Sequence, residues 1–256
     1  MNNNLINALK DLVIKAGRIA LDIKKVGLIV ENKLDHSPVS NADKEISELI
    51  YRDLQTLTPG VTIICEEQPL PILSSDTFWL VDPIDGTKSY ISGKDTYTIN
   101  IGLIKNGIPT IGLIYQPENA KLYYTDPNGN LEIEQNLVKI PINRELKKSG
   151  FNAVISFCHP NKATTDFLEK YLINKIESIA SSIKLCLIAE GEADIYPKFG
   201  RTMEWDIAAG HALIKAGGGN IFDPSGKEIT YGKKNFTNAD FFACGPYWLQ
   251  NQKYNV

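Results

Sequence analysis

Apolar side chains recur with a helical period at the start of the chain. Between Leu5 and Lys25 they return every three or four positions, which places them on one face of an α-helix. A second helical pattern begins near Ser40, which stands three residues before Asp43 and resembles an N-terminal capping arrangement. The sequence therefore predicts two amphipathic helices ahead of any long strand.

Short apolar runs follow, each of a length typical of a β-strand. They are Val61–Cys65, Phe78–Asp82, Thr98–Ile104, Ile111–Tyr115 and Lys121–Thr125. Asn106-Gly107 is a strong hairpin signal between two of these runs, because both residues accept the positive φ of a tight turn. We therefore predict helices followed by a mostly antiparallel sheet in the first half of the chain.

Strands and helices alternate after about Phe151. The expected strands are Asn152–Phe157, Ala193–Pro197, Asn220–Asp223 and Phe241–Cys244, and the expected helices are Thr165–Ile176, Ser182–Glu190 and Trp205–Ala216. Three glycines at 217–219 end the last helix. We predict an α/β fold of two closely packed halves, residues 1–149 and 150–256, with no long linker between them.

Composition and charge exclude some classes of protein. At 256 residues and 43% apolar content, the chain can bury a substantial core. A net charge of −3 without a Lys/Arg stripe argues against a nucleic-acid-binding surface. A small anionic substrate needs only a local cluster of positive charge. The longest apolar runs stay below 18 residues, so we expect no transmembrane segment.

The cysteines are widely scattered along the chain. Cys65, Cys158, Cys186 and Cys244 form no C-x-x-C pair, which argues against a zinc site or a disulfide framework. Their apolar neighbours fit buried, reduced thiols. We expect a cytoplasmic protein, with peripheral attachment to the inner membrane as an alternative. The choice between monomer and homodimer stays open.

Acidic residues lie at the ends of several predicted elements. They are Glu66 and Glu67 after one strand, Asp82 and Asp85 after the next, and Asp206 at the start of a helix. We expect Pro83 to force a turn that brings Asp85 back beside Asp82. Converging carboxylates must be neutralised, and magnesium commonly bridges carboxylates to a substrate phosphate. A pair of such ions can polarise the phosphate and lower the pKa of an attacking water.

A structural interpretation is open for each of these features taken alone. Asp85-Gly86 is an ordinary turn dipeptide, Glu66-Glu67 could be solvated charge, and Asp206 could cap a helix. Gly86-Thr87, however, adds a backbone that can approach a phosphate closely and a hydroxyl beside the acidic residues. The combination favours a metal-assisted phosphatase.

Two longer stretches resemble a known family. Trp79–Thr87, which reads WLVDPIDGT, closely resembles the signature of the inositol monophosphatase superfamily. Glu204–Gly210, which reads EWDIAAG, is similar to the second signature of that superfamily. The resemblance runs from about Ser37 to Gly245. It implies a layered αβαβα sandwich with the active site between the two halves.

Within the superfamily, the chain most resembles the bacterial CysQ branch of 3′(2′),5′-bisphosphate nucleotidases. Lys88 directly after Gly86-Thr87 supports this resemblance, as do the stretches Ser181–Gly191 and Tyr196–Gly200. The branch implies Mg²⁺-dependent hydrolysis of the 3′-phosphate of adenosine 3′,5′-bisphosphate, with AMP and phosphate as products. Because the nucleophile is water, no covalent phosphoenzyme is expected.

The resemblance also implies roles for individual residues. Glu66, Asp82 and the backbone carbonyl of Ile84 would hold one Mg²⁺, and Asp82, Asp85 and Asp206 would hold a second, with a third ion left open. Asp43 and Thr87 would orient and deprotonate the attacking water. The residues expected to contact substrate are Glu66, Ile84, Asp85, Gly86, Thr87, Lys88, Ser156, His159, Ser182, Lys184 and Asp206.

One departure from the branch bears on the substrate. The branch usually has Ser-Arg-Ser-His where this chain has Ser156-Phe157-Cys158-His159, so an arginine is missing. An inositol monophosphatase or a sugar bisphosphatase therefore remains an alternative. A non-catalytic protein that binds metal or nucleotide is a further alternative. Retention of every metal carboxylate and of Thr87 argues against it.

Overall fold

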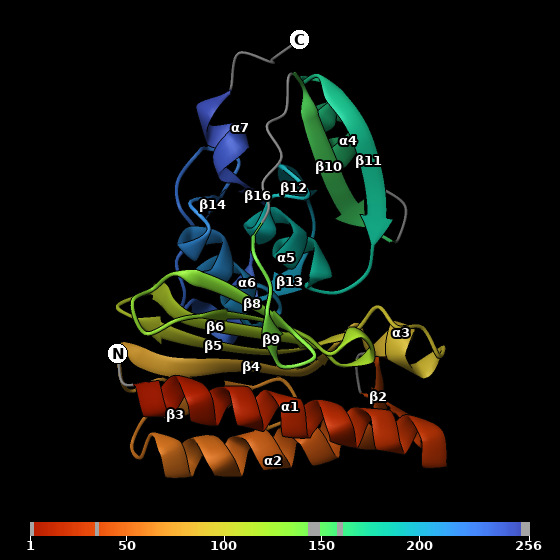
Figure 1. Ribbon diagram of the computed structural model, residues 1–256, viewed down its shortest axis with the longest axis vertical. Helices are drawn as coiled ribbons and strands as arrows, with labels where there is room; N and C mark the ends of the chain where they lie inside the picture. Colours follow the sequence, from red (N-terminus) through yellow and green to blue (C-terminus); the bar gives the residue numbers. More distant parts are fainter. Residues whose placement is uncertain (1–2, 34–35, 143–148, 158–160, 252–256) are drawn as a thin grey trace.

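The computed structural model describes residues 3–33, 36–142, 149–157 and 161–251. His159 and Cys158, which the sequence analysis singled out, lie outside these residues. Helices and sheets alternate in five layers (Figure 1). Helices α1 (Asn3–Val26) and α2 (Asn41–Leu57) form one outer layer and pack on a seven-stranded sheet. The predicted layered α/β sandwich is confirmed.

The seven-stranded sheet has its strands in chain order. It consists of β3 (Thr62–Cys65), β4 (Thr77–Asp85), β5 (Thr98–Lys105), β6 (Ile108–Gln116), β7 (Lys121–Thr125), β8 (Leu131–Gln135) and β9 (Val138–Lys139). Among the described strands of this sheet, only β3 and β4 pair in parallel. Asn106 and Gly107 have φ of 51° and 73° between β5 and β6, so the predicted hairpin is confirmed.

A five-stranded mixed sheet belongs to the second half of the chain. Its order is β11 (Ile173–Ile179), β10 (Phe151–Ser156), β12 (Ile195–Lys198), β16 (Phe241–Cys244) and β14 (Asn220–Phe222). Helices α5 (Ile183–Glu190) and α6 (Glu204–Ala216) lie between the two sheets, and α4 (Lys162–Leu168) and α7 (Pro246–Gln250) lie on the far side (Figure 1).

The remaining elements are short. They are β1 (Val30–Asn32), β2 (Pro38–Ser40), α3 (Thr87–Ile91), β13 (Thr202–Met203), β15 (Thr237–Asn238) and the 3₁₀ turns Pro117–Asn119 and Lys234–Phe236. Strands β1 and β2 pair with each other, as do β13 and β15. Within the described residues, no helix combines the length and the apolar character that crossing a bilayer requires.

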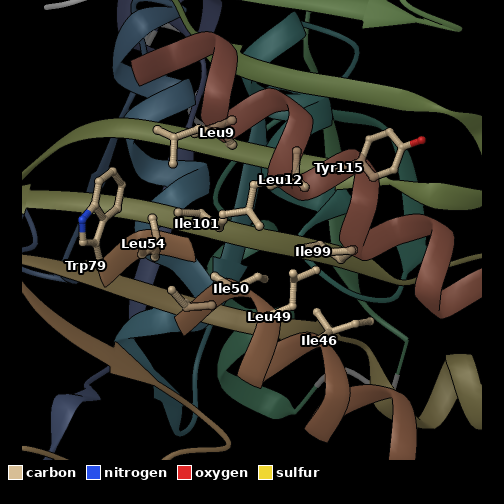
Figure 2. Close-up of a cluster of buried hydrophobic side chains, with 14 of the residues drawn as sticks. Leu9, Leu12, Ile46, Leu49, Ile50, Leu54, Trp79, Ile99, Ile101 and Tyr115 are labelled. Carbon is tan, nitrogen blue, oxygen red and sulfur yellow. The ribbon is translucent and has the colours of Figure 1, made fainter. Parts of the chain in front are cut away.

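The core beneath the seven-stranded sheet explains the helical pattern at the start of the chain. Leu9 and Leu12 of α1 meet Ile46 and Ile50 of α2 over the strands, as Figure 2 shows. All four side chains are buried. The apolar stripes that predict the two helices are therefore the faces that pack on the sheet.

Small residues let α6 approach the opposite face of this sheet. A Cβ on Gly112 of β6 would lie 2.2 Å from the carbonyl oxygen of Ala209 in α6. A Cβ on Gly102 of β5 would lie 2.9 Å from the Ala209 nitrogen. This close packing fixes α6, which carries Asp206, against the sheet that carries Asp82 and Asp85.

Two predictions about local structure are wrong. The expected helix Thr165–Ile176 ends at Leu168, and its second part belongs to strand β11. Isoleucines spaced three apart at 173, 176 and 179 imitate a helical period, but parallel pairing with β10 decides the conformation.

Pro83 does not force a turn either. Strand β4 continues through Asp85, with a bulge at which Asp82 pairs with Asn100 and Asp85 pairs with Thr98. The segment from Asn100 to Thr98 on β5 spans two residue steps, whereas the segment from Asp82 to Asp85 on β4 spans three. The extra residue on β4 forms a bulge, which changes the direction in which its side chains point. It brings the two aspartates to one end of the sheet without reversing the chain.

Candidate active site

The carboxylates converge because their elements end at one place. Glu66 directly follows β3, and its amide donates to the carbonyl of Val81 on the parallel neighbour β4 at 3.1 Å. Asp206 lies in the first turn of α6 and accepts a hydrogen bond from the Met203 amide at 2.7 Å. One carboxylate oxygen from each of Glu66, Asp82 and Asp206 lies within 4.8 Å of the others.

Asp82 is the most buried member of this group. Its exposed fraction is 2%, and its Oδ1 has no hydrogen-bond partner among the described residues. Burial raises the pKa of Asp82 well above its usual value, and the charges of Glu66, Asp85 and Asp206 raise it further. A buried carboxylate in that position costs free energy unless a cation neutralises it.

The donor set fits a hard divalent cation. It offers carboxylate oxygens from Glu66, Asp82 and Asp206, and the buried Oδ1 of Asp82 has no partner among the residues that the structure describes. Oxygen ligands of this kind are those that Mg²⁺ and similar ions take, whereas zinc and copper sites favour nitrogen or sulfur. The group can therefore hold a divalent metal ion.

Asp85 lies beside this group but has different partners. The Asn100 amide donates to its Oδ2 at 3.4 Å, and the Ser182 backbone also hydrogen-bonds to it. Removal from water raises the pKa of Asp85, while the nearby Lys184 ammonium lowers it. Burial is the largest cause of the raised pKa of Asp206, and the charge of Asp85 is the next largest. The four carboxylates thus form one electrostatic unit.

Asp43 and Thr87 meet at the edge of the carboxylate group. Asp43 closes the capping box of α2, where its Oδ2 accepts from the Ser40 amide at 2.8 Å and from the Ser40 hydroxyl at 2.5 Å. Its Oδ1 accepts from the Thr87 hydroxyl at 3.3 Å. Burial raises the pKa of Asp43, and its bonds to Ser40 oppose this shift. The cap therefore holds one oxygen and leaves the other facing Thr87.

The segment after Asp85 places a hydroxyl and a carbonyl together. Gly86 has a φ of 90° and precedes α3, which begins at Thr87. The Thr87 hydroxyl also lies 3.1 Å from the carbonyl oxygen of Ile84, a predicted metal ligand. Lys88 is exposed on the first turn of α3.

A polar cavity of about 160 Å³ opens next to Asp85 and Asp206. Its lining includes three predicted substrate contacts, Ser156, Ser182 and Lys184. The Lys184 ammonium donates to the Ile179 carbonyl at 3.1 Å and to the Ser181 carbonyl at 2.5 Å. The Ser182 hydroxyl is buried and bonds to Asn100 Oδ1 at 2.8 Å, so it also ties α5 to β5.

Several lining residues were not found by sequence reasoning. Tyr196, Lys198 and Thr202 line the cavity from β12 and β13. The Tyr196 hydroxyl lies 3.2 Å from Ser156 Oγ. Tyr196–Gly200 served only as a mark of the branch in the sequence. Because side chains of a β-strand point alternately to its two faces, a strand at this position could have indicated that Tyr196 and Lys198 share one face.

Lys33 is a further residue that the sequence did not indicate. Its ammonium lies 2.8 Å from Glu66 Oε1 and 2.5 Å from Glu67 Oε1. Partial burial disfavours the charge of Lys33, but the carboxylates of Glu66 and Glu67 outweigh burial and raise its pKa. A lysine in the loop between β1 and β2 carries no spacing signal that would place it there.

Comparison with known proteins defines the class of this site. The family model of the inositol monophosphatase family matches residues 1–253. The chain belongs to the inositol monophosphatase family.

Individual relatives lie in one branch of that family. The 3′(2′),5′-bisphosphate nucleotidase CysQ of Buchnera aphidicola is 37% identical over 220 residues, which cover 84% of this chain and 83% of the relative. The protein of the same name from Escherichia coli K12 is 37% identical over 216 residues, with 83% and 87% covered.

The crystal structure of CysQ from Bacteroides thetaiotaomicron superposes with a TM-score of 0.80 at 30% identity and covers 94% of this chain and 97% of that one. A staphylococcal inositol monophosphatase solved with its products matches in fold, with a TM-score of 0.79 at 19% identity over 96% of this chain and 92% of the other.

Proposed function

We propose that this protein is a Mg²⁺-dependent 3′(2′),5′-bisphosphate nucleotidase that converts adenosine 3′,5′-bisphosphate to AMP and phosphate. The observation that carries the proposal is the buried Oδ1 of Asp82, which has no partner in the described part of the chain and lies within a group of carboxylates beside a polar cavity. Relatives at 37% identity that bear this activity in their names support the choice of substrate.

The residues divide between two metal positions. Glu66, Asp82 and the Ile84 carbonyl would hold one Mg²⁺, and Asp82, Asp85 and Asp206 would hold another. When bound, the ions neutralise the carboxylates, polarise the phosphate and stabilise the leaving oxygen. Asp82 belongs to both sets, which agrees with its central place among Glu66, Asp85 and Asp206 in the electrostatics of the site.

Thr87 and Asp43 would activate the attacking water. The Thr87 hydroxyl donates to Asp43 Oδ1 at 3.3 Å, so a lone pair on the hydroxyl oxygen can accept a proton from a water. Asp43 then takes the proton that Thr87 passes on. Its raised pKa suits this role, because a carboxylate with a raised pKa is a stronger base.

Both halves of the chain, 1–149 and 150–256, would contact the substrate. Gly86, Thr87 and Lys88 would contact the phosphate that is cleaved. Ser156, Ser182 and Lys184, with His159 outside the described residues, would contact the nucleotide. Lysine is suited to phosphate as a compact point charge, and Lys198 adds a second such charge to the cavity.

Hydrolysis of inositol phosphates or sugar bisphosphates is the second candidate. Phe157 favours it, because this side chain stands where the nucleotidase branch usually has an arginine and is 62% exposed. We also propose a cytoplasmic location for the protein.

Phosphate release from a substrate panel tests the proposal. The panel contains adenosine 3′,5′-bisphosphate, its sulfated analogue, inositol 1-phosphate and fructose 1,6-bisphosphate, each with Mg²⁺ and with EDTA. We expect the highest kcat/KM for adenosine 3′,5′-bisphosphate and no turnover with EDTA. A wide preference for inositol 1-phosphate would assign the protein to the second candidate instead.

A further inference from the structure

Phe157 is an exposed aromatic residue next to the polar cavity. It directly follows Ser156, which lines the cavity at the end of β10, and its side chain is 62% exposed. Tyr196 is the aromatic residue among the described lining, but it is 5% exposed and its ring packs edge-on against Phe241. Of the rings of Phe157 and Tyr196, it is therefore Phe157 that offers open surface to a bound molecule.

A lysine from the other half of the chain lies over this ring. The Lys94 ammonium is 4.2 Å from the centroid of the Phe157 ring. Lys94 follows α3 in the first half of the chain, and in Figure 1 the arrowhead of β10 points toward the layer that carries α3. A cation above an aromatic face is attracted by the negative charge of the π system. The contact therefore orients the ring and joins the two halves at this point.

The backbone of Lys94 is fixed on both sides of the residue. Its amide donates to the Ser89 carbonyl at 2.9 Å, and its carbonyl accepts from the Lys24 ammonium at 3.0 Å. Lys24 also pairs with Glu118 at 2.5 Å. Because these bonds limit the positions that the Lys94 side chain can reach, its ammonium is pre-organised over the Phe157 ring.

The loop that carries Lys94 borders the segment expected to contact the cleaved phosphate. A Cβ added to Gly86 would lie 3.0 Å from the carbonyl oxygen of Thr96 and 3.1 Å from Cβ of Ser181. Ser181 lines the polar cavity. Gly86, the loop and the cavity lining therefore meet at one place, and the contact with Lys94 puts the Phe157 ring beside it.

Adenine is a part of the proposed substrate whose ring has no assigned partner. The carboxylate group and the segment 86–88 account for the cleaved phosphate, and Lys184 and Lys198 supply positive charge within the cavity. A nucleobase has a large aromatic face, and an exposed aromatic side chain binds such a face by stacking. Despite the contact with Lys94, most of the Phe157 side chain stays open for a base.

We propose that Phe157 is the platform on which the adenine base stacks, and that Lys94 is a positioning residue that holds the ring for it. This inference rests on the proposed function, because it requires a nucleotide substrate. Stacking binds the substrate away from the cleaved bond, so it acts on KM and leaves kcat nearly unchanged. It also gives a function to the ring at the position where the nucleotidase branch usually has an arginine.

Kinetics with and without the base test the proposal. Adenosine 3′,5′-bisphosphate is compared with its abasic analogue, in which hydrogen replaces adenine at C1′. F157A removes the ring and F157W keeps an aromatic face, whereas K94M removes the cation and K94R keeps it. I108A is the control for loss of an exposed apolar side chain, because Ile108 is 45% exposed at the end of the seven-stranded sheet opposite to Asp85.

The expected result is an effect of Phe157 that depends on the base. F157A should raise KM for the nucleotide about tenfold, with kcat within about twofold of the wild type, and should leave KM for the abasic analogue unchanged. F157W should keep the wild-type KM. K94M should raise KM for the nucleotide about threefold, and K94R should restore it. I108A should match the wild type with both substrates.

Two results would overturn the assignment of the base to Phe157. They are wild-type kinetics of F157A with the nucleotide, and an equal rise in KM for the nucleotide and the abasic analogue, which would mean that the ring only supports the local structure. Failure of the proposed function has a different signature, because the wild type itself would then not hydrolyse adenosine 3′,5′-bisphosphate. That result would overturn both proposals.

Discussion

Replacing Asp82 with asparagine should have opposite effects on stability and on catalysis. The side chain is 2% exposed, its Oδ1 is unpartnered among the described residues, and Glu66, Asp85 and Asp206 add like charge around it. Asparagine has nearly the same shape and removes the charge. Its amide can also donate to the remaining carboxylates.

The size of the stability effect follows from the buried group. An unsatisfied buried polar atom costs about 1–3 kcal/mol, and more when it is charged. We therefore expect metal-free D82N to be more stable than the metal-free wild type by about 2 kcal/mol. For a chain of this size, that difference raises Tm by about 4–8 °C.

Magnesium should reverse the order of the two proteins. A ligand at one hundred times its Kd stabilises the folded state by about 2.7 kcal/mol, and D82N should lose most of this gain. Its kcat should fall at least about a hundredfold, because Asp82 would serve both of the proposed metal positions.

Differential scanning fluorimetry with and without Mg²⁺, together with phosphate release, measures these effects. D166N is the control, since Asp166 is exposed on α4 and pairs with Lys162. A metal-free D82N that is no more stable than the wild type would refute the electrostatic reasoning. Full activity of D82N would refute the metal assignment.

Three further predictions concern Thr87, Lys198 and His211. T87V should lower kcat by roughly a hundredfold or more while leaving the stabilisation by Mg²⁺ intact. T87S keeps the hydroxyl and should recover most of the activity. A kcat of T87V equal to that of the wild type would show that Thr87 takes no part in the proton transfer. K198M should raise KM for adenosine 3′,5′-bisphosphate about tenfold or more, the loss expected for one charge-assisted hydrogen bond, with kcat nearly constant; an unchanged KM would place the second phosphate away from Lys198. Burial lowers the pKa of His211 from 6.5 to about 4. The unfolded chain therefore binds more protons between these pH values, so stability should be complete above pH 6.5 and fall by about 3 kcal/mol as pH drops to 4. Urea unfolding of H211Q should show less of this decline than the wild type or the exposed-site control H36Q, and an equal decline in H211Q would assign it to other groups.

The sequence predicts the parts of this fold that depend on local rules. The capping box at Ser40 and Asp43, the stripe on α1 and the hairpin at Asn106-Gly107 can each be recognised from the spacing of residues that are close in sequence. The structure confirms all three. Strand β11 is different, because only its pairing with β10 distinguishes it from a helix.

The candidate site likewise has features that follow from local sequence rules and features that depend on tertiary packing. The acidic residues could be found because they lie at element ends and in two long signatures. Asp82 and Asp85 do come together, but through a bulge opposite Asn100 and Thr98, which no turn rule predicts. Lys33 and Lys198 reach the site through tertiary packing alone, from a loop and from a strand of the other sheet. Lys33 has no local pattern that distinguishes it from a solvated lysine, and the alternation in β12 places Lys198 on the same face as Tyr196 without indicating that this face lines the cavity.

The fate of oxygen from water tests the central claim most directly. Hydrolysis of adenosine 3′,5′-bisphosphate in H₂¹⁸O with Mg²⁺ should give phosphate with one ¹⁸O atom per turnover and AMP that is unlabelled and keeps its 5′-phosphate. The same mixture with EDTA should give no product. Label in the nucleotide, loss of the 5′-phosphate, or labelled phosphate formed equally well with EDTA would contradict metal-assisted attack of water on the 3′-phosphate.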